Sequence, residues 1–169
     1  MTTYDQSEPP VSHVHNGFEV YPMPVFAAME TSDVDALAQW YHDALGFGIM
    51  FKMPGPGGQP TLVHLRRRKY QDVLILPIQP GSDIPEVGRG WSLCLHAGED
   101  IDQLVARAAA LPVIGKTRVE PVTDTSWNTR QVRILDPDGR LLVFSQPRFV
   151  TELTERWRDA FQADRAPGS

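Results

Sequence analysis

The chain has 169 residues, with 16 Lys or Arg against 21 Asp or Glu, which gives a formal net charge of −5. The 41% hydrophobic and 22% charged fractions are ordinary for a globular protein, and the acidic balance argues against a general nucleic-acid binder, whose domain would be basic. No apolar run approaches the roughly 20 residues needed to span a bilayer, and the first residues lack a signal-peptide pattern. The lone Cys94, between Leu93 and Leu95, allows no intrachain disulfide and is predicted to be a small buried core residue. We therefore expect a cytoplasmic protein that contacts neither nucleic acid nor membrane.

The first half of the chain predicts a strand, a helix and three more strands. Residues 1–19 are polar and contain proline, so we expect a flexible N-terminal arm there. Apolar residues from Val20 to Met29 predict the first strand. Ser32 begins a capping-box pattern for a helix, and Gly46 suits the end of that helix. Further strands are expected at 47–53, 61–67 and 71–78.

The second half repeats this order of elements. A strand is expected at 90–97, followed by a helix that carries Ile101 and Leu104 at helical spacing. The sequence DPDG at 136–139 predicts the turn of the last hairpin. Strands are expected near 115–121, 129–135 and 140–146. Residues 148–169 are expected to hold an amphipathic C-terminal helix and a tail.

Two pairs of similar segments indicate a duplication. DVDAL at 33–37 matches DIDQL at 100–104, and LILPIQP at 74–80 matches LLVFSQP at 141–147; both pairs are separated by 67 residues (33 to 100 and 74 to 141). Two matches at one separation predict a first module at 20–80 and a second at 81–147. The expected fold class is α+β, with two tandem βαβββ modules that form a cupped mixed sheet, plus the C-terminal helix.

The two signature segments of this duplication resemble a known superfamily. METSDVDALAQWYHDALGF at 29–47 is similar to the first strand–helix segment of the vicinal oxygen chelate superfamily, and WNTRQVRILDPDGRLLVF at 127–144 is similar to its closing hairpin. The superfamily includes glyoxalase I, extradiol dioxygenases, fosfomycin-resistance enzymes and bleomycin-resistance proteins. The resemblance covers about residues 20–147 and implies a cup that is usually completed in a dimer, so we expect a homodimer.

The resemblance also identifies four positions where enzymes of the superfamily hold a divalent metal. His, Glu or Gln ligands come from the first and fourth strands of each module, and imidazole and carboxylate suit Fe, Ni, Zn or Mn. The equivalent positions in this chain are Phe26, Leu76, Leu93 and Val143. All four are apolar, no immediate neighbour is a His or a carboxylate, and strand alternation predicts that all four point into the cup. We therefore expect no metal, no other cofactor and no catalytic residue.

The same alternation adds Trp91 and Ser145 to the expected lining of the cup. Trp127, in a loop next to the strand that carries Arg130, falls where the superfamily often has the mouth of its cleft. Core packing is the alternative for both tryptophans. The expected ligand-contacting set is Phe26, Leu76, Trp91, Leu93, Trp127, Arg130, Val143 and Ser145.

These features favour a metal-free binding protein of the bleomycin-resistance type, which sequesters a planar aromatic antibiotic or metabolite without chemistry. One alternative is a lyase, dioxygenase or thiol transferase of the same fold with relocated metal ligands. His64 and His96 are the candidate acid–base groups for such an enzyme, but neither has an evident Cys, Ser or Asp partner by spacing. The second alternative is a scaffold or regulatory domain in which the filled cup is simply core.

Overall fold

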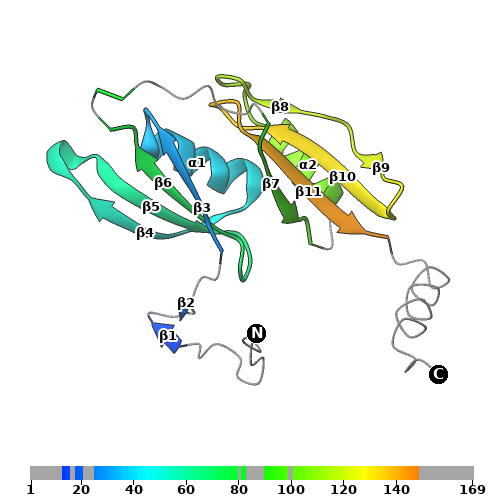
Figure 1. Cartoon of the computed structure of the whole chain (residues 1–169), viewed down its shortest axis with the longest axis horizontal. Coiled ribbons are helices and arrows are strands. Elements are labelled where there is room, and N and C mark those ends of the chain that lie inside the picture. The colour runs from blue at the N-terminus through cyan, green and yellow to red at the C-terminus, as the bar shows by residue number, and fades with distance from the viewer. Residues whose placement is uncertain are drawn as a thin grey trace, which may run out of the picture. The chain divides into compact units, whose positions relative to one another are not determined.

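The structure is a computed structural model whose described residues are 13–15, 18–20, 25–79, 81–82, 90–98 and 101–148. The chain divides into two compact units: the N-terminal unit holds residues 1–42 and 46–82, and the C-terminal unit holds residues 43–45 and 83–169. Figure 1 shows a sheet with a helix beside it in each unit. The expected C-terminal helix falls outside the described residues. No helix within the described ranges is long and apolar enough to cross a membrane.

The N-terminal unit has the strand order of a βαβββ module. β3 (Ala27–Thr31) pairs in parallel with β6 (Asp72–Pro77), and β6 pairs antiparallel with β5 (Pro60–Arg66). β4 (Gly48–Pro54) pairs antiparallel with β5 and lies at the edge of the sheet. α1 (Val34–Leu45) connects β3 to β4. A parallel β3–β6 pair at one edge of an otherwise antiparallel sheet follows from this order of connections.

The first strand of the module is shorter than the sequence predicts. A continuous strand is expected from Val20 to Met29, but β3 begins only at Ala27. Pro22 and Pro24 lie inside the expected strand, and proline cannot donate a hydrogen bond to a strand ladder. Val25 and Phe26 are therefore not part of the strand, contrary to the prediction, and residues 21–24 lie outside the described residues.

Short elements occur where the sequence predicts none. β1 (His13–His15) and β2 (Phe18–Val20) pair antiparallel within and next to the segment 1–19, which is expected to be a flexible arm. A 3-10 turn, η1 (Pro56–Gly58), separates β4 from β5. Its glycines supply the positive φ angle of 70° at Gly57, which other residues adopt at a cost.

Local signals set both ends of α1. Asp33 is the N-cap, because its Oδ1 accepts a hydrogen bond of 2.9 Å from the backbone N–H of Ala36. The expected cap, Ser32, is one residue too early, and the capping-box prediction is wrong in that respect. Gly46 ends the helix in the left-handed region, with φ of 72°, and its N–H donates to the carbonyl of His42 at 3.1 Å. The prediction for Gly46 is confirmed.

One face of the N-terminal sheet packs against α1. The Tyr41 hydroxyl donates to Met29 Sδ on β3 at 3.3 Å, and the Tyr41 ring meets the rings of Trp40 and Phe47 edge-on, each at 5.5 Å between centroids. Tyr41 and Phe47 are 0% exposed and Trp40 is 6% exposed, so all three rings belong to the core. The sheet residues buried on this face are Met29, Val63, Leu65, Val73 and Ile75.

The C-terminal unit repeats the plan of the first. β7 (Ser92–His96) pairs in parallel with β11 (Leu141–Pro147), and β11 pairs antiparallel with β10 (Thr129–Leu135). α2 (Ile101–Ala109) lies against β10 and β11 (Figure 1). The α+β class and the two tandem βαβββ modules are therefore confirmed.

The edge of the C-terminal sheet differs from the prediction of one strand near 115–121. The structure has two short strands there, β8 (Arg118–Val119) and β9 (Thr123–Asp124), and both pair antiparallel with β10. Pro121, between them, cannot donate to a ladder, which accounts for the break.

The DPDG turn is held by a buried ionic cluster. Asp136 is 0% exposed, and its Oδ1 accepts hydrogen bonds from the backbone N–H groups of Asp138 (3.0 Å) and Arg140 (2.7 Å). The Arg140 guanidinium donates to Asp138 at 2.7 Å and to Asp136 at 3.1 Å. Burial disfavours the charged guanidinium, but these bonds outweigh it and raise the pKa of Arg140. The turn predicted from DPDG is confirmed, and its charges serve the structure of the hairpin.

Candidate functional site

Each sheet has a face that turns away from its helix, and we call it the distal face. Along each strand of the N-terminal sheet, distal side chains alternate with buried side chains that face α1. Phe26, just before β3, is in phase with the distal set and is 46% exposed. The distal residues of β3, β5 and β6 are Ala28, Glu30, Leu62, His64, Arg66, Asp72, Leu74 and Leu76.

A β-bulge in β4 adds two large apolar side chains to this distal face. Ile49 is opposite Leu65, a helix-face residue, whereas Phe51 is opposite His64, a distal residue. Residues two apart normally share a face, but the register shifts between Ile49 and Phe51 and reverses the side. Phe51 and Met53 therefore lie on the distal face, where they are 51% and 45% exposed.

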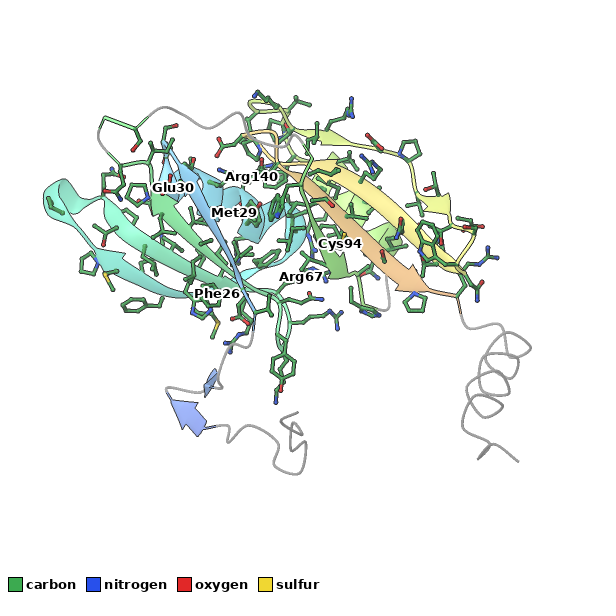
Figure 2. All side chains as sticks on the ribbon, in the orientation of Figure 1. Phe26, Met29, Glu30, Arg67, Cys94 and Arg140 are labelled. Carbon is green, nitrogen blue, oxygen red and sulfur yellow. The ribbon has the colours of Figure 1, made fainter. Side chains whose placement is uncertain are left out.

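Phe26 and Leu76 both belong to the distal face of the N-terminal sheet, as the alternation predicts. Leu76 is the partner of Glu30 on β3, and Glu30 is four residues from Phe26. Figure 2 shows Phe26 and Glu30 toward opposite ends of β3. At about 3.3 Å per residue, Phe26 and Leu76 are roughly 13 Å apart along the strands. They share a face but do not touch, so they could contact the two ends of one flat ligand.

Within this apolar face lies a cluster of three polar side chains. The Asp72 carboxyl group is 0% exposed, and its Oδ1 accepts a hydrogen bond of 2.8 Å from Arg66 Nε. The same oxygen is 2.7 Å from His64 Nε2. The His64 and Arg66 side chains are 18% and 13% exposed. The Asp72 carboxylate can be buried without a large energetic cost, because its charge is paired and hydrogen-bonded.

Sequence reasoning missed the partnership of His64 and Asp72. The two residues are eight positions apart, but the hairpin pairs Arg66 with Asp72 and His64 with Leu74. This register makes His64 and Asp72 diagonal neighbours on one face. The sequence predicts both strands, at 61–67 and 71–78. Pairing these two strands as a hairpin is the signal that could have revealed the contact between His64 and Asp72.

The distal face of the C-terminal sheet contains Val143 but not Leu93. In the parallel pair, Val143 is the partner of Cys94, and Leu93 is the partner of Leu142, a fully buried helix-face residue. Leu93 therefore points to the helix face, and the prediction that it lines the cup is wrong. Cys94 takes its place on the distal face and is exposed (Figure 2), which also corrects the prediction of a buried cysteine.

The error arises because the distal residues of β3 lie an even number of positions before α1, whereas those of β7 lie an odd number before α2. Ala28 is the distal residue beside Leu74 and lies six positions before Val34, the start of α1. Cys94, the distal residue beside Val143, lies seven positions before Ile101, the start of α2. The same number of residues counted back from each helix therefore reaches the distal face in one sheet and the helix face in the other. A shift by an odd number of residues moves a side chain to the opposite face of a strand.

Arg130 also lies on the helix side of its sheet. Its guanidinium donates to both carboxylate oxygens of Asp102 on α2, each at 2.8 Å. The hydrogen bond from Arg130, with its positive charge, lowers the pKa of Asp102 below the ordinary value. The pair fastens α2 to β10, and the prediction that Arg130 faces the ligand on the cup side is wrong.

The remaining expected contacts lie in the C-terminal unit. Ser145 is on the distal face with Val143, and its Oγ accepts a hydrogen bond of 2.8 Å from Gln131 Nε2. Trp127, in the turn before β10, is 63% exposed. Trp91 immediately precedes β7, is 48% exposed, and is in phase with Leu93 rather than with Val143, so the prediction that it lines the cup beside Val143 is wrong.

The donor atoms on these faces do not fit the metal that enzymes of the superfamily hold. Phe26 and Leu76 occupy the two positions in the N-terminal unit, and Val143 with Cys94 occupies the distal positions in the C-terminal unit. Across the described ranges, no group of three or more His, Cys, Asp or Glu is placed to hold a metal ion. Of these four side chains only the Cys94 thiol offers a lone pair to a cation, so a metal would need further ligands.

Paired βαβββ modules with a helix on one side of each sheet define the glyoxalase-like class of α+β proteins. The family model described as the Glyoxalase/Bleomycin resistance protein/Dioxygenase superfamily matches residues 25–144. The chain belongs to this superfamily. No match is found among curated proteins.

Solved structures with the same fold include antibiotic-related proteins. TioX from Micromonospora sp. ML1 has a TM-score of 0.56 and 19% identity over 72% of this chain and 95% of its own. The bleomycin resistance determinant encoded on transposon Tn5 has a TM-score of 0.55 and 23% identity over 74% and 98%. TnmS3, an antibiotic binding protein from Streptomyces sp. CB03234, has a TM-score of 0.54 and 22% identity over 73% and 93%. At these identities the likeness shows the fold alone.

Proposed function

We propose that the protein is a metal-free small-molecule binder that sequesters a planar aromatic antibiotic or metabolite. The observation that carries this proposal is the distal face of the N-terminal sheet. Phe26, Phe51 and Met53 are each about half exposed there, at 46%, 51% and 45%. Large apolar side chains gathered on one exposed surface of a globular protein mark an interaction site more often than chance.

The chemistry of this face suits a flat ring. Aromatic side chains prefer offset or edge-on contact with other rings, which contributes about 0.5–1.5 kcal/mol beyond the burial of area. Methionine adapts its shape to an irregular ligand. The fold neighbours support the proposal, because TnmS3 is described as an antibiotic binding protein and another neighbour as a bleomycin-binding protein complexed with bleomycin.

The C-terminal unit has exposed aromatic and distal-face residues of its own. Trp127 and Trp91 are exposed aromatic side chains, and Val143 and Ser145 lie on the distal face. We expect at least one of the tryptophans to stack on the ligand, so that binding changes tryptophan emission. We also expect a homodimer, because proteins of this superfamily usually complete the cup in a dimer.

A ligand screen tests the proposal directly. Purified protein is titrated with bleomycin and with a panel of flat aromatic antibiotics, while its melting temperature and tryptophan emission are recorded. Binding should raise the melting temperature, since a ligand that binds only the folded state stabilises it. Phe51→Ala should weaken binding about tenfold or more, as expected for the loss of an aromatic anchor. Val113→Ala, which removes an 81% exposed apolar side chain from the C-terminal unit, is the matched control and should bind as wild type.

Elemental analysis separates this proposal from a metal-dependent enzyme. Protein purified without chelator should carry no stoichiometric Fe, Ni, Zn or Mn. About one tightly held metal per chain would contradict the proposal and favour relocated ligands. No response to any flat aromatic compound would favour the scaffold alternative instead.

A further inference from the structure

A histidine anchored on a buried carboxylate interrupts the apolar distal face. We propose that His64 determines ligand specificity there: it presents a fixed hydrogen-bond acceptor that selects planar aromatic compounds bearing a hydroxyl group. This inference rests on the proposed function and names the chemical class of its ligand.

The tautomer of His64 follows from its partner. Asp72 Oδ1 is 2.7 Å from His64 Nε2 and also accepts from Arg66 Nε at 2.8 Å. An ionised carboxylate paired with arginine can only accept hydrogen bonds, so Nε2 must carry the hydrogen of the neutral ring. Nδ1 then holds a lone pair and is an acceptor. The ring cannot exchange these roles without losing its bond to Asp72.

The accepting nitrogen is available to a ligand. The His64 ring makes its hydrogen bond to a described residue through Nε2, and its side chain is 18% exposed. Within the described part of the chain, no buried side-chain nitrogen or oxygen lacks a hydrogen-bond partner. Nδ1 has no such partner there, so it is not a buried atom and reaches the surface of the distal face.

The neighbours of His64 are suited to a flat ring. Across the sheet, Leu74 is its partner on β6 and Phe51 is its partner on β4, while Ala28 is opposite Leu74 on β3. These four residues form a row over the face of the sheet in which three members are apolar. A ring lying on Phe51, next to His64 in this row, would bring a hydroxyl at its edge to His64 Nδ1. On a mostly apolar binding surface, a single polar group sets the orientation of the ligand through its hydrogen bond.

The test compares three probes that differ at one position: 9-phenanthrol, 9-methoxyphenanthrene and phenanthrene. Each is titrated into the full-length protein at pH 7.5 and followed by fluorescence. The phenol should bind about three- to tenfold more tightly than the methyl ether, which keeps the oxygen but has no hydrogen to donate. Equal affinities for the phenol and the ether would overturn the inference and leave the proposed function standing. If none of the three binds, the proposed function fails for flat aromatic ligands and the inference fails with it.

A variant and its control assign the preference to His64. His64→Leu should lose the preference for the phenol over the methyl ether. His96→Leu is the matched control, because His96 is a strand histidine whose Nδ1 already accepts a hydrogen bond of 3.0 Å from the Gly98 N–H. It should retain the preference. A preference that survives in folded His64→Leu would overturn the inference.

A second measurement does not depend on the variant folding. Nitrogen-15 chemical shifts of the histidine rings distinguish the two neutral tautomers in the wild-type protein. His64 should carry its hydrogen on Nε2, and 9-phenanthrol should shift the Nδ1 resonance as a hydrogen bond forms. A hydrogen on Nδ1 at pH 7.5, or an Nδ1 resonance that ignores the bound phenol, would overturn the assignment of the acceptor.

Discussion

Two phenylalanines four residues apart, Phe47 and Phe51, are assigned to the core and to the distal face. Measuring the stability of their alanine variants tests this assignment. Phe47 follows α1 and is 0% exposed, with its ring 5.5 Å from the Tyr41 ring at an interplanar angle of 66°. Phe51 is 51% exposed on the distal face, to which the bulge in β4 turns it. Truncating each to alanine should therefore have very different costs.

The expected magnitudes follow from burial. Phe47→Ala removes a fully buried ring, which typically costs about 3–5 kcal/mol including the cavity that it leaves. Phe51→Ala removes a ring that is already half in water, so it should cost about 1 kcal/mol, near half of the transfer free energy of a phenylalanine. In a protein of this size, 1 kcal/mol corresponds to about 2–4 °C of melting temperature. We expect a loss of about 10 °C for Phe47→Ala and about 3 °C for Phe51→Ala.

Thermal unfolding followed by circular dichroism or calorimetry measures both values under the same conditions. The ligand affinity of each folded variant is measured on the same samples, and only Phe51→Ala should bind more weakly. Equal losses of stability would refute the division, because Phe51 would then be core. A Phe51→Ala variant that loses stability but keeps wild-type affinity would place the ligand elsewhere.

Three further predictions test the faces and the helix ends. The Cys94 thiol should react with Ellman's reagent in the native protein nearly as fast as in denaturant; a thiol that reacts only after unfolding would return Cys94 to the core. Because the folded-state pKa of Asp102 is lowered, its contribution to stability is present above about pH 4 and is lost as the pH falls through the lowered value. The difference in melting temperature between wild type and Arg130→Gln should therefore shrink in acid, and a difference that stays constant down to about pH 2 would disprove the ion pair. Gly46→Ala should cost about 1–2 kcal/mol by chemical denaturation, since the φ angle of 72° disfavours a β-carbon, and an unchanged midpoint would contradict the left-handed cap.

The sequence determined the features of the fold that depend on local chemistry. The second helix, α2, follows from the spacing of Ile101 and Leu104, and the end of α1 follows from Gly46. The closing hairpin follows from the DPDG turn at 136–139. The separation of 67 residues correctly relates the first residues of the two helices, Val34 and Ile101. Such signals act over a few residues, so they are readable without knowledge of what the element packs against.

Tertiary pairing alone decided which side chains share a face. The distal residues of β7 lie an odd number of positions before α2, and those of β3 an even number before α1, which places Cys94 rather than Leu93 beside Val143. A bulge in β4 turned Phe51 to the distal face although it lies two residues after Ile49. Alternation has a period of two, so one inserted residue inverts every later position, and no local preference of the residues themselves reveals the insertion.

The contact between His64 and Asp72 has the same origin. Each residue alone resembles an ordinary strand position, and only the register of β5 against β6 brings His64 Nε2 to 2.7 Å from the carboxylate. Burial of Asp72 then makes that contact obligatory, because an unpaired carboxylate in the interior is costly. The sequence therefore supplied the two chemical groups, and the sheet register, fixed by the packing of its buried face, supplied their geometry.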